Sequence, residues 1–314
     1  MVAKVIVNPY AGRWLALNRL PEVETALKSA GLDYEIAITE GPGHGIELAK
    51  QATQQGFRPI ISAGGDGSIS EVVNGVALAA GLGETQNKPK DIPPLGIIPL
   101  GSANDLVDNL GLPKDLNLAS EAIAKGKVKW IDLGVVIILD GETWRTRFFD
   151  NNAAIGLEPY ITLIQQRIHR VRGDIRYLLA TLLGIRDNPK WQVQMEWEGG
   201  NFEGLITLVT VGNCPRTGGL FYMTPHANPS DGQLTFVYGY MPTRLKILTL
   251  LPKTMKSGEG SYVEHPSIHE IHSSWLRIHS LQPTPAHADG EIFSNVVHDL
   301  EYRILPRVLP ILSA

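Results

Sequence analysis

The sequence predicts an α/β nucleotide-binding domain, in which helices flank a parallel sheet, followed by an antiparallel β-rich second domain. Two observations predict this fold class. β-branched runs alternate with helical patterns in the first third of the chain, and alternating strand patterns take over near Val128. We expect the first domain to span 1–128, with the C-terminal tail 306–314 as a candidate addition to it. The second domain is expected to span 129–305.

The elements of the first domain follow from period and spacing. Four β-branched runs are expected strands: Lys4–Val7, Tyr34–Thr39, Pro59–Ala63 and Leu95–Pro99. Three helices are expected between them, over Leu17–Leu27, Ile46–Gln55 and Ile69–Ala80. Strands that are joined through helices lie parallel in one sheet, and such sheets bind ligands beyond the carboxyl ends of their strands.

The second domain is predicted from a series of short strands, of which Trp191–Trp197 alternates strictly between apolar and polar residues. The expected strands are Ile131–Leu139, Thr143–Phe149, Trp191–Trp197, Leu205–Val211, Gln233–Tyr240, Trp275–His279 and Leu300–Leu305. Leu205–Val211 is expected to return beside Trp191–Trp197 after a turn at 198–201. Two helical insertions are expected near 158–186 and 243–257.

Composition and charge exclude several classes of protein. The 314 residues carry a formal net charge of −4, so no general basic field would attract nucleic acid, and we expect no such partner. A single cysteine, Cys214, fits a reducing compartment. The N-terminal apolar run is too short for a signal peptide, and none approaches the ~20 residues of a membrane span. We therefore expect a cytoplasmic protein that meets the inner membrane surface only peripherally.

The segment Ile60–Glu71 carries the strongest chemical signal. A strand leads into Gly64, Gly65, Asp66, Gly67 and Ser68, where a helix is expected to begin. Glycines allow a close backbone approach, and a helix start offers N–H groups to an anion, so this turn predicts a phosphate cradle. Ser68 and Glu71 fit a capping box with Ser68 as N-cap. The alternative is a tight strand–helix turn without a ligand, but the acidic Asp66 favours a magnesium or nucleotide site.

A second segment, Leu95–Leu106, repeats the pattern. A strand is followed by Gly101 and Ser102, and Ser102 with Asp105 fits another capping pattern. Because carboxyl ends of neighbouring parallel strands meet at one edge of the sheet, the two turns are expected to face one crevice. No Gly-x-x-x-x-Gly-Lys segment is present, so the cradle is not a P-loop.

A series of motifs along the chain resembles the diacylglycerol kinase catalytic domain family. That family includes bacterial lipid kinases and sphingosine kinases. Its nucleotide domain is similar to those of NAD kinases and 6-phosphofructokinases. The resembling motifs are Val7-Asn8-Pro9 with Gly12, Gly64–Ser68, Gly101–Asp105, Asn152–Gly156, Gly212-Asn213 with Gly218-Gly219, Pro225–Leu234 and Asp289–Glu291. Ser68 and Ser102 stand where the family usually has threonine, and Gly218-Gly219 where relatives often have three glycines. Each serine keeps the hydroxyl.

The resemblance implies an ATP-dependent lipid kinase and assigns roles to residues. It places the ATP phosphates over a set that we expect to bind nucleotide: Asn8, Thr39, Gly64, Gly65, Asp66, Gly67, Ser68, Ser102, Asn104 and Asp105. It implies that Glu291 is the base that accepts the lipid hydroxyl proton, with Asp289 in support. On residue pattern alone, an exposed turn is the favoured interpretation of Asp289-Gly290-Glu291, and the preceding motifs reverse that preference.

A structural Mg²⁺ is also implied by the resemblance, in addition to the magnesium that accompanies ATP. Its expected ligands are Asp231, with oxygens near Asn228 and Gln233, because hard cations prefer oxygen. The alternative for this loop is a turn before a strand. His265, His269 and His272 are interpreted as polar positions on a loop and an edge strand.

The segment 160–186 is predicted to be a basic amphipathic helix that contacts the membrane. Isoleucines and leucines recur in it at helical spacing, and five arginines supply positive charge: Arg167, Arg170, Arg172, Arg176 and Arg186. The alternatives are a helix packed on the β domain and a homodimer contact. Gly173-Asp174 is expected to break the helix.

Three functions remain open. The leading one is transfer of the γ-phosphate of ATP to a lipid hydroxyl, with diacylglycerol as the expected acceptor and a place in phospholipid biosynthesis. An NAD kinase-like phosphotransferase shares the glycine cradle. A non-catalytic lipid-binding regulator is a third alternative, which the retention of Asp66, Asp289 and Glu291 argues against.

Overall fold

The computed structural model describes residues 2–83, 91–140, 143–168 and 174–314. The chain divides into two compact units, of which the first comprises Met1–Leu133 and Leu305–Ala314 and the second comprises Gly134–Ile304. The sequence had placed the first boundary near 128 and the second near 305. The combination of a helix-flanked parallel sheet with an antiparallel β-rich unit confirms the predicted fold class.

A parallel sheet forms the centre of the first unit. Its strands are β1 (Ala3–Val7), β2 (Tyr34–Ile38), β3 (Ile60–Gly64) and β4 (Leu95–Pro99), in the order β2-β1-β3-β4. The chain's C-terminal strand β14 (Glu291–Ser313) joins beside β4 through the parallel pair Ile311 and Leu95. All four predicted strands are therefore present in this unit, each within two residues of its expected limits.

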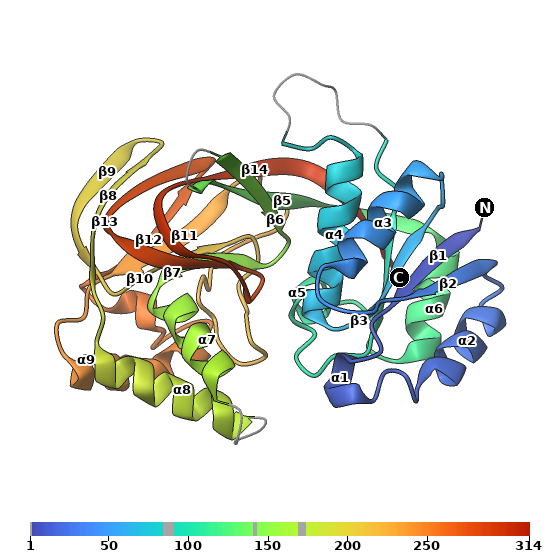
Figure 1. Cartoon of the computed structure of the whole chain (residues 1–314), viewed down its shortest axis with the longest axis horizontal. Helices are drawn as coiled ribbons and strands as arrows, with labels where there is room; N and C mark the ends of the chain where they lie inside the picture. Colours follow the sequence, from blue (N-terminus) through green and yellow to red (C-terminus); the bar gives the residue numbers. More distant parts are fainter. Residues whose placement is uncertain (1, 84–90, 141–142, 169–173) are drawn as a thin grey trace. The chain divides into compact units, whose positions relative to one another are not determined.

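Helices cover both faces of this sheet (Figure 1). They are α1 (Ala11–Trp14), α2 (Leu20–Ser29), α3 (His44–Gln54), α4 (Asp66–Ala79), α5 (Asp105–Leu110) and α6 (Leu116–Lys125). α2 contacts α6, and α3 contacts α4. Leu27 of α2 and Ile123 of α6 share a core cluster with Val5 and Ile98 of the strands. Each helix pair therefore buries its apolar faces on the sheet, which fixes the loops at the strand ends.

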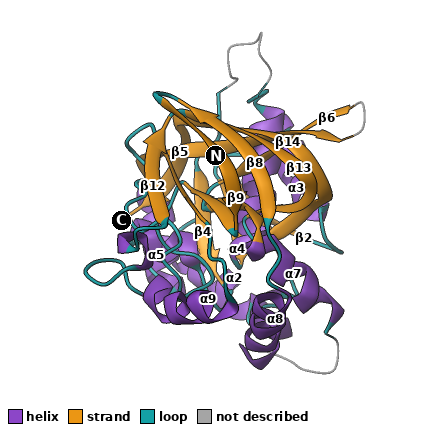
Figure 2. Cartoon of the chain, turned by 90° about the vertical axis from the view of Figure 1, so that its left-hand side faces the viewer, coloured by secondary structure: helices purple, strands orange, loops and turns teal. Residues whose placement is uncertain are grey.

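The second unit is an antiparallel sheet in which most strands face a common core (Figure 2). Its strands are β5 (Lys127–Asp140), β6 (Thr143–Phe149), β7 (Asn152–Gly156), β8 (Trp191–Trp197), β9 (Gly200–Ile206), β10 (Leu208–Gly212), β11 (Leu234–Gly239), β12 (Ile268–Ser273) and β13 (Trp275–Ala288). The order is β12-β11-β10-β7-β13-β14, with β8 on β13, β9 on β8, and β5 between β14 and β6. β5 and β14 each contribute residues to both units.

The predicted strand Leu205–Val211 was wrong. The chain instead changes sheet partners at Thr207, because β9 returns on β8 while β10 pairs with β7 and β11. Thr207 donates its N–H to the carbonyl of Gly239 and accepts the N–H of Leu157. An apolar run across this point looks like one strand in sequence, although its two halves belong to different ladders.

The last two strands are longer than predicted. β13 continues nine residues past His279, and its ladder with β14 has register shifts between His279 and His287. Pro283 and Pro285 lie in that stretch, and proline is tolerated in a strand at such irregularities. β14 likewise runs through Pro306. Because prolines interrupt the sequence pattern that is typical of a strand, the full length of neither strand was predicted.

Helices of the second unit are α7 (Leu157–Arg167), α8 (Asp174–Asp187) and α9 (Arg244–Leu250), with the 3₁₀ turns η1 (Leu251–Met255) and η2 (Tyr262–Glu264). They correspond to the two predicted helical insertions. The predicted break falls partly outside the described residues, because Gly173 is not described and α8 begins at Asp174. Among the described residues, no helix is both long and apolar enough to span a membrane.

Candidate active site

Helix α4 begins directly after β3 and exposes an uncapped N-terminus. Gly65 is its N-cap, in an extended conformation, and as a glycine it makes no side-chain cap hydrogen bond to the first N–H groups of the helix. The predicted capping box was wrong, because Ser68 lies inside the first turn. Its hydroxyl accepts a 2.9 Å hydrogen bond from Nδ2 of Asn8, which follows β1. The first turn of α4 therefore keeps N–H groups that an external anion can accept.

Carboxylates from α4 cap the two neighbouring helices instead. Glu71 accepts the N–H groups of Gly43 at 2.6 Å and Gly45 at 2.8 Å, at the start of α3. Asp66 accepts the N–H of Asp105 at 2.6 Å, at the start of α5. Helices α3, α4 and α5 follow the parallel strands β2, β3 and β4. The start of α4 has a glycine as its N-cap, and the carboxylate of Asp66, its first residue, bonds to α5 instead, so the first N–H groups of α4 can bind a phosphate.

Two glycines bring the turns after β3 and β4 into backbone contact. A Cβ built on Gly101 would lie 2.5 Å from Cα of Gly65, and one built on Gly65 would lie 3.1 Å from Cα of Gly101. A side chain at either position would force the turns apart. The sequence predicted that these turns share one edge of the sheet, and the structure places them together.

The turn after β4 is closed by Asn104. Its side chain accepts the N–H of Gly101 at 3.1 Å and donates to the carbonyl of Gly101 at 3.0 Å. Asn104 is the N-cap of α5 in a left-handed conformation (φ 53°), so the predicted N-cap role of Ser102 was wrong. Ser102 is exposed within the turn, which leaves its hydroxyl accessible to a ligand. Thr39, at the end of β2, is buried and donates its N–H to the carbonyl of Val7.

Asp66 is held in an unfavourable environment for a carboxylate. Burial, together with the nearby negative charge of Asp105, raises the pKa of Asp66 from 3.8 to about 6, although the N–H groups of α5 oppose the rise. A residue whose ionisation is disfavoured, located beside a glycine cradle, is typical of a functional site more than of a structural cap.

In the second unit, Asp289 anchors the predicted catalytic turn. Its Oδ1 accepts the N–H groups of Asn151 and Asn152 at 3.0 and 3.1 Å, and its Oδ2 accepts that of Asp150 at 3.2 Å. Asp289 itself takes a left-handed conformation (φ 48°). Its carboxylate thus ties the β13–β14 turn to the start of β7. This geometry supports a positioning role for Asp289.

Glu291 begins β14 and pairs with a cation. Its Oε2 accepts a 2.8 Å bond from Nη2 of Arg147 on β6, and 43% of the Glu291 side chain is exposed. The carboxylate is therefore oriented by a neighbouring strand and is accessible to a substrate. Among Asp289 and Glu291, only the second has a geometry suited to proton transfer with a bound alcohol.

A buried hydrogen bond between His287 and Glu158 supports the same turn. Nε2 of His287 lies 3.1 Å from Oε1 of Glu158, which begins α7, and the His287 side chain is 2% exposed. Glu158 also accepts bonds from Asn152 and Thr210. Burial alone would raise the pKa of Glu158, but His287 and these two donors outweigh it and hold the pKa below 4.5. Nδ1 of His287 accepts the N–H of Gly290, so the network reaches the Asp289–Glu291 turn.

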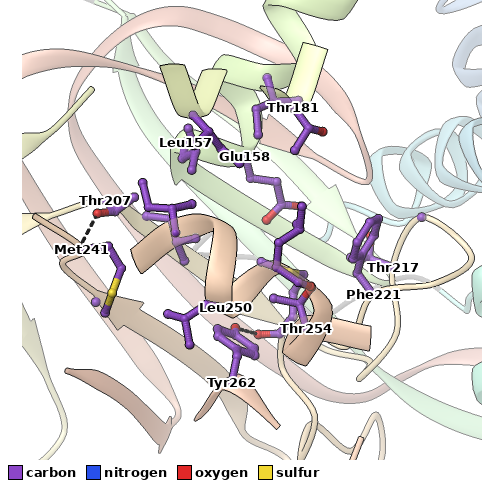
Figure 3. A pocket seen from close by; sticks show the side chains of 18 of the residues that line it. Leu157, Glu158, Thr181, Thr207, Thr217, Phe221, Met241, Leu250, Thr254 and Tyr262 are labelled. Atoms are coloured by element: carbon purple, nitrogen blue, oxygen red, sulfur yellow. Dashed lines mark hydrogen bonds between the residues drawn. The ribbon is translucent and has the colours of Figure 1, made fainter. Parts of the chain in front are cut away.

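An apolar cavity of about 210 Å³ adjoins this network (Figure 3). Its walls come from α7, α8, α9 and η1, with Leu157, Ile161, Ile185, Ile247 and Leu250 among the lining residues. Its lining also includes threonine side chains, and Glu158, His287 and Gly290 line it next to the Asp289–Glu291 turn. The cavity therefore combines an apolar interior with access to the turn that carries Glu291, and it can hold part of a hydrocarbon chain.

The expected structural cation site has the geometry of a turn. Oδ1 of Asp231 accepts the N–H of Gln233 at 2.9 Å, and Oδ1 of Asn228 accepts the N–H of Ser230 at 3.1 Å. In the part of the chain that is described, no three His, Cys, Asp or Glu side chains gather as a metal site. Hydrogen bonding thus accounts for this loop without a cation, and the Mg²⁺ stays a prediction.

Comparisons with known proteins agree with this geometry. The profile of the diacylglycerol kinase catalytic domain matches residues 2–136, and that of the YegS C-terminal NAD kinase beta sandwich-like domain matches residues 151–313. The chain belongs to the diacylglycerol kinase catalytic domain family. It is 27% identical over 290 residues to the diacylglycerol kinase of Staphylococcus carnosus, covering 92% of this chain and 88% of that one.

Solved structures support the fold. A diacylglycerol kinase from Bacillus anthracis superposes with a TM-score of 0.75 at 23% identity, covering 99% of this chain and 96% of that chain. Yeast NADH kinase, complexed with NADH, gives a TM-score of 0.50 at 12% identity, covering all of this chain and 84% of that chain. As a member of the diacylglycerol kinase family, the chain is a kinase, and kinases of the family use ATP.

Several residues of this kinase's site were not found from its sequence. Arg147 was missed because its partner Glu291 lies 144 residues away and no local spacing connects them. Glu158 was missed because it looks like an ordinary first-turn helix residue. A weak signal existed for His287, a histidine two residues before the predicted catalytic turn.

Proposed function

We propose that this kinase transfers the γ-phosphate of ATP to the hydroxyl of a lipid, with diacylglycerol as the acceptor and phosphatidic acid as the product. The observation that carries the proposal is the apolar cavity, because its lining includes Gly290 of the turn that presents Glu291. A site for a small polar acceptor has no need of such an interior. A lipid acceptor requires an apolar space for its acyl chain and a carboxylate beside its hydroxyl group.

The nucleotide side of the proposal rests on the first unit. ATP, as its magnesium complex, is expected to place a phosphate on the N-terminus of α4, within a backbone cradle that admits no side chain at Gly65 or Gly101. Ser68 and Ser102 each offer a hydroxyl there, and Asn8 orients Ser68. Phosphoryl transfer depends mainly on such positioning and charge neutralisation.

In the proposed step, the lipid hydroxyl oxygen forms a bond to the γ-phosphorus while the bond from that phosphorus to the β-phosphate oxygen breaks, and ADP leaves. Glu291 accepts the hydroxyl proton. Arg147 orients the Glu291 carboxylate, and Asp289 fixes the backbone of the turn. The Glu158–His287 pair supports the same backbone through Gly290.

The test is a transfer assay with γ-labelled ATP in which diacylglycerol, sphingosine, phosphatidylglycerol and NAD are offered in parallel. We expect label in diacylglycerol, and we expect Glu291→Gln to abolish transfer while ATP binding is retained. Glu203→Gln is the matched control, since Glu203 is an exposed glutamate on β9 of the same unit. Label in NAD alone, or full activity of Glu291→Gln, would overturn the proposal.

A further inference from the structure

Arg147 of β6 uses only part of the hydrogen-bonding capacity of its side chain. A guanidinium carries five N–H donors, and Nη2 of Arg147 gives one of them to Oε2 of Glu291 at 2.8 Å. Its Nε is buried and meets no acceptor within the part of the chain that the structure describes. The contact with Glu291 is thus a single bond, although arginine binds a carboxylate most strongly through two parallel bonds. Donors of the guanidinium therefore remain for a second anion.

The strand that carries Arg147 is held by the core, while the guanidinium is accessible. Arg147 pairs with Val136 of β5, and the two residues that follow it, Phe148 and Phe149, are buried. The Arg147 side chain is 20% exposed, and that of Glu291 is 43% exposed. A ligand that reaches the Glu291 carboxylate can therefore also reach the guanidinium beside it.

Positive charge is scarce in the turns that are proposed to hold the phosphates. The two glycine turns, 64–68 and 101–105, contain no Lys or Arg, and each contains an aspartate. The N-terminus of α4 offers the equivalent of about half a positive charge. A phosphoryl group in transfer spreads its negative charge over three oxygens, and kinases neutralise it with metal ions and with Lys or Arg. A side-chain cation for this purpose therefore has to come from outside the two turns.

Reaction geometry brings the phosphoryl group close to Arg147. A general base lies roughly 3 Å from the hydroxyl oxygen whose proton it accepts. That oxygen approaches the γ-phosphorus to about 3–3.5 Å before it attacks, so the phosphorus comes within about 6–7 Å of the carboxylate of Glu291. Nη2 of Arg147 lies 2.8 Å from an oxygen of the same carboxylate. The guanidinium and the phosphoryl group are therefore neighbours of one carboxylate during the proposed step.

We propose that Arg147 is a catalytic residue that binds the γ-phosphoryl group during transfer, in addition to orienting Glu291. Its remaining N–H groups donate to oxygens of the phosphoryl group, while Nη2 keeps its bond to Glu291. As in the proposed step, the bond from the hydroxyl oxygen to the γ-phosphorus forms, the bond from that phosphorus to the β-phosphate oxygen breaks, and the hydroxyl proton passes to Glu291. Arg147 exchanges no proton, and the inference rests on the proposed function.

The alternative is that Arg147 acts only through Glu291, as a positioning residue. Both roles predict a slower reaction when Arg147 is replaced, so a loss of rate does not separate them. They differ in whether Arg147 contacts an oxygen of the γ-phosphate. The decisive measurement therefore changes that oxygen and the arginine together.

The experiment compares single-turnover transfer from ATP and from ATPγS, in which sulfur replaces one γ-oxygen, to a short-chain diacylglycerol. Arg147→Gln should lower the rate from ATP about 10²–10³-fold, as expected for a lost donor to transition-state charge. Sulfur is a weaker hydrogen-bond acceptor than oxygen, so the ratio of the ATP rate to the ATPγS rate should fall about tenfold in Arg147→Gln. An unchanged ratio, with both nucleotides slowed equally, would overturn the inference.

Matched variants show whether the effect is specific. Arg277 also pairs with a glutamate, Glu301, in the same unit, and its side chain is 58% exposed. Arg277→Gln should keep both the rate and the ratio of the unmodified protein. Arg147→Lys keeps the charge but not the planar fork, so its rate and its ratio should lie between those of Arg147→Gln and the unmodified protein. Thermal melting of each variant verifies that it folds.

The choice of acceptor separates this inference from the proposed function. The ratio is measured on whichever acceptor takes up label in the parallel transfer assay. If label enters NAD alone and the ratio falls in Arg147→Gln, the proposed lipid acceptor is wrong and the role of Arg147 stands. If label enters diacylglycerol and the ratio is unchanged, the role of Arg147 fails alone.

Discussion

Replacing Asp66 with asparagine should make the nucleotide-free protein more stable at neutral pH. The amide keeps an oxygen that can accept the N–H of Asp105, which Asp66 holds at 2.6 Å, but it removes a buried negative charge. Burial and Asp105 raise the pKa of Asp66 from 3.8 to about 6. That difference of roughly two pKa units corresponds to about 3 kcal/mol, which is an upper limit for the gain.

The sign of the pH dependence follows from the raised pKa. Between pH 4 and 6 the folded state keeps a proton on Asp66 that the unfolded state has lost, so raising the pH destabilises the fold. The penalty is absent below pH 3.8 and complete above about 6. We therefore expect Asp66→Asn to exceed the unmodified protein most at pH 7.5 and to approach it at pH 4.

Calorimetric unfolding in EDTA, without nucleotide, at pH 4 and pH 7.5 measures both quantities. Asp115→Asn is a matched control, because Asp115 also caps a helix, α6, but at an exposed site. Asparagine is about as good an N-cap as aspartate, so we expect little change there. If Asp66→Asn is instead less stable than the unmodified protein at pH 7.5, Asp66 is a structural cap and its functional interpretation is wrong.

Three further changes test other parts of the site. Gly101→Ala should destabilise the fold by about 1–3 kcal/mol and weaken ATP binding, because its Cβ would meet the facing glycine at 2.5 Å; calorimetry and nucleotide titration measure these. Glu158→Gln should destabilise by about 1–3 kcal/mol, because the amide keeps only one of the two oxygens that accept the buried donors of His287, Asn152 and Thr210. It should also remove the stability that the lowered pKa of Glu158 supplies above pH 4.5, measured by unfolding against pH. Arg147→Gln should lower kcat without a measurable change in Tm, because its pair with Glu291 is partly exposed.

Each of these has a contradicting result. Normal ATP affinity in Gly101→Ala would show that the two turns can separate without affecting the nucleotide. If the loss of stability at acidic pH is the same in Glu158→Gln as in the unmodified protein, protonation of Glu158 is not its source. A large fall in Tm for Arg147→Gln would mean that its main role is structural, and kcat would then say nothing about orientation of the base.

The fold was predictable where short-range periodicity decides it. Each strand of the first sheet is a single apolar run bounded by turn residues, and helices at regular spacing require it to be parallel. Prediction failed where partners are distant in sequence. Thr207 ends one ladder and begins another, and Pro283 lies within a strand at an irregular register, so neither boundary has a local signature.

Within the site, the sequence located the glycine turns but misassigned the helix caps. Ser68 and Glu71 have the spacing of a capping box, yet Gly65 adopts the extended N-cap conformation and the helix begins at Asp66. Glu71 then reaches back to α3. The spacing of a motif along one helix does not show that one of its side chains hydrogen-bonds to N–H groups at the start of another helix. That contact depends on how the two helices pack in three dimensions.

The pattern of caps carries more functional information than any single motif. An N-terminus whose N–H groups are left unsatisfied is unfavourable unless water or a ligand accepts them. The chain provides carboxylates for α3 and α5 through Glu71 and Asp66, and both come from α4. Asp66 is itself the first residue of α4, but its carboxylate accepts the N–H of Asp105 at the start of α5. The helix that supplies two caps and lacks its own is therefore the one whose N-terminus can be filled by a phosphate.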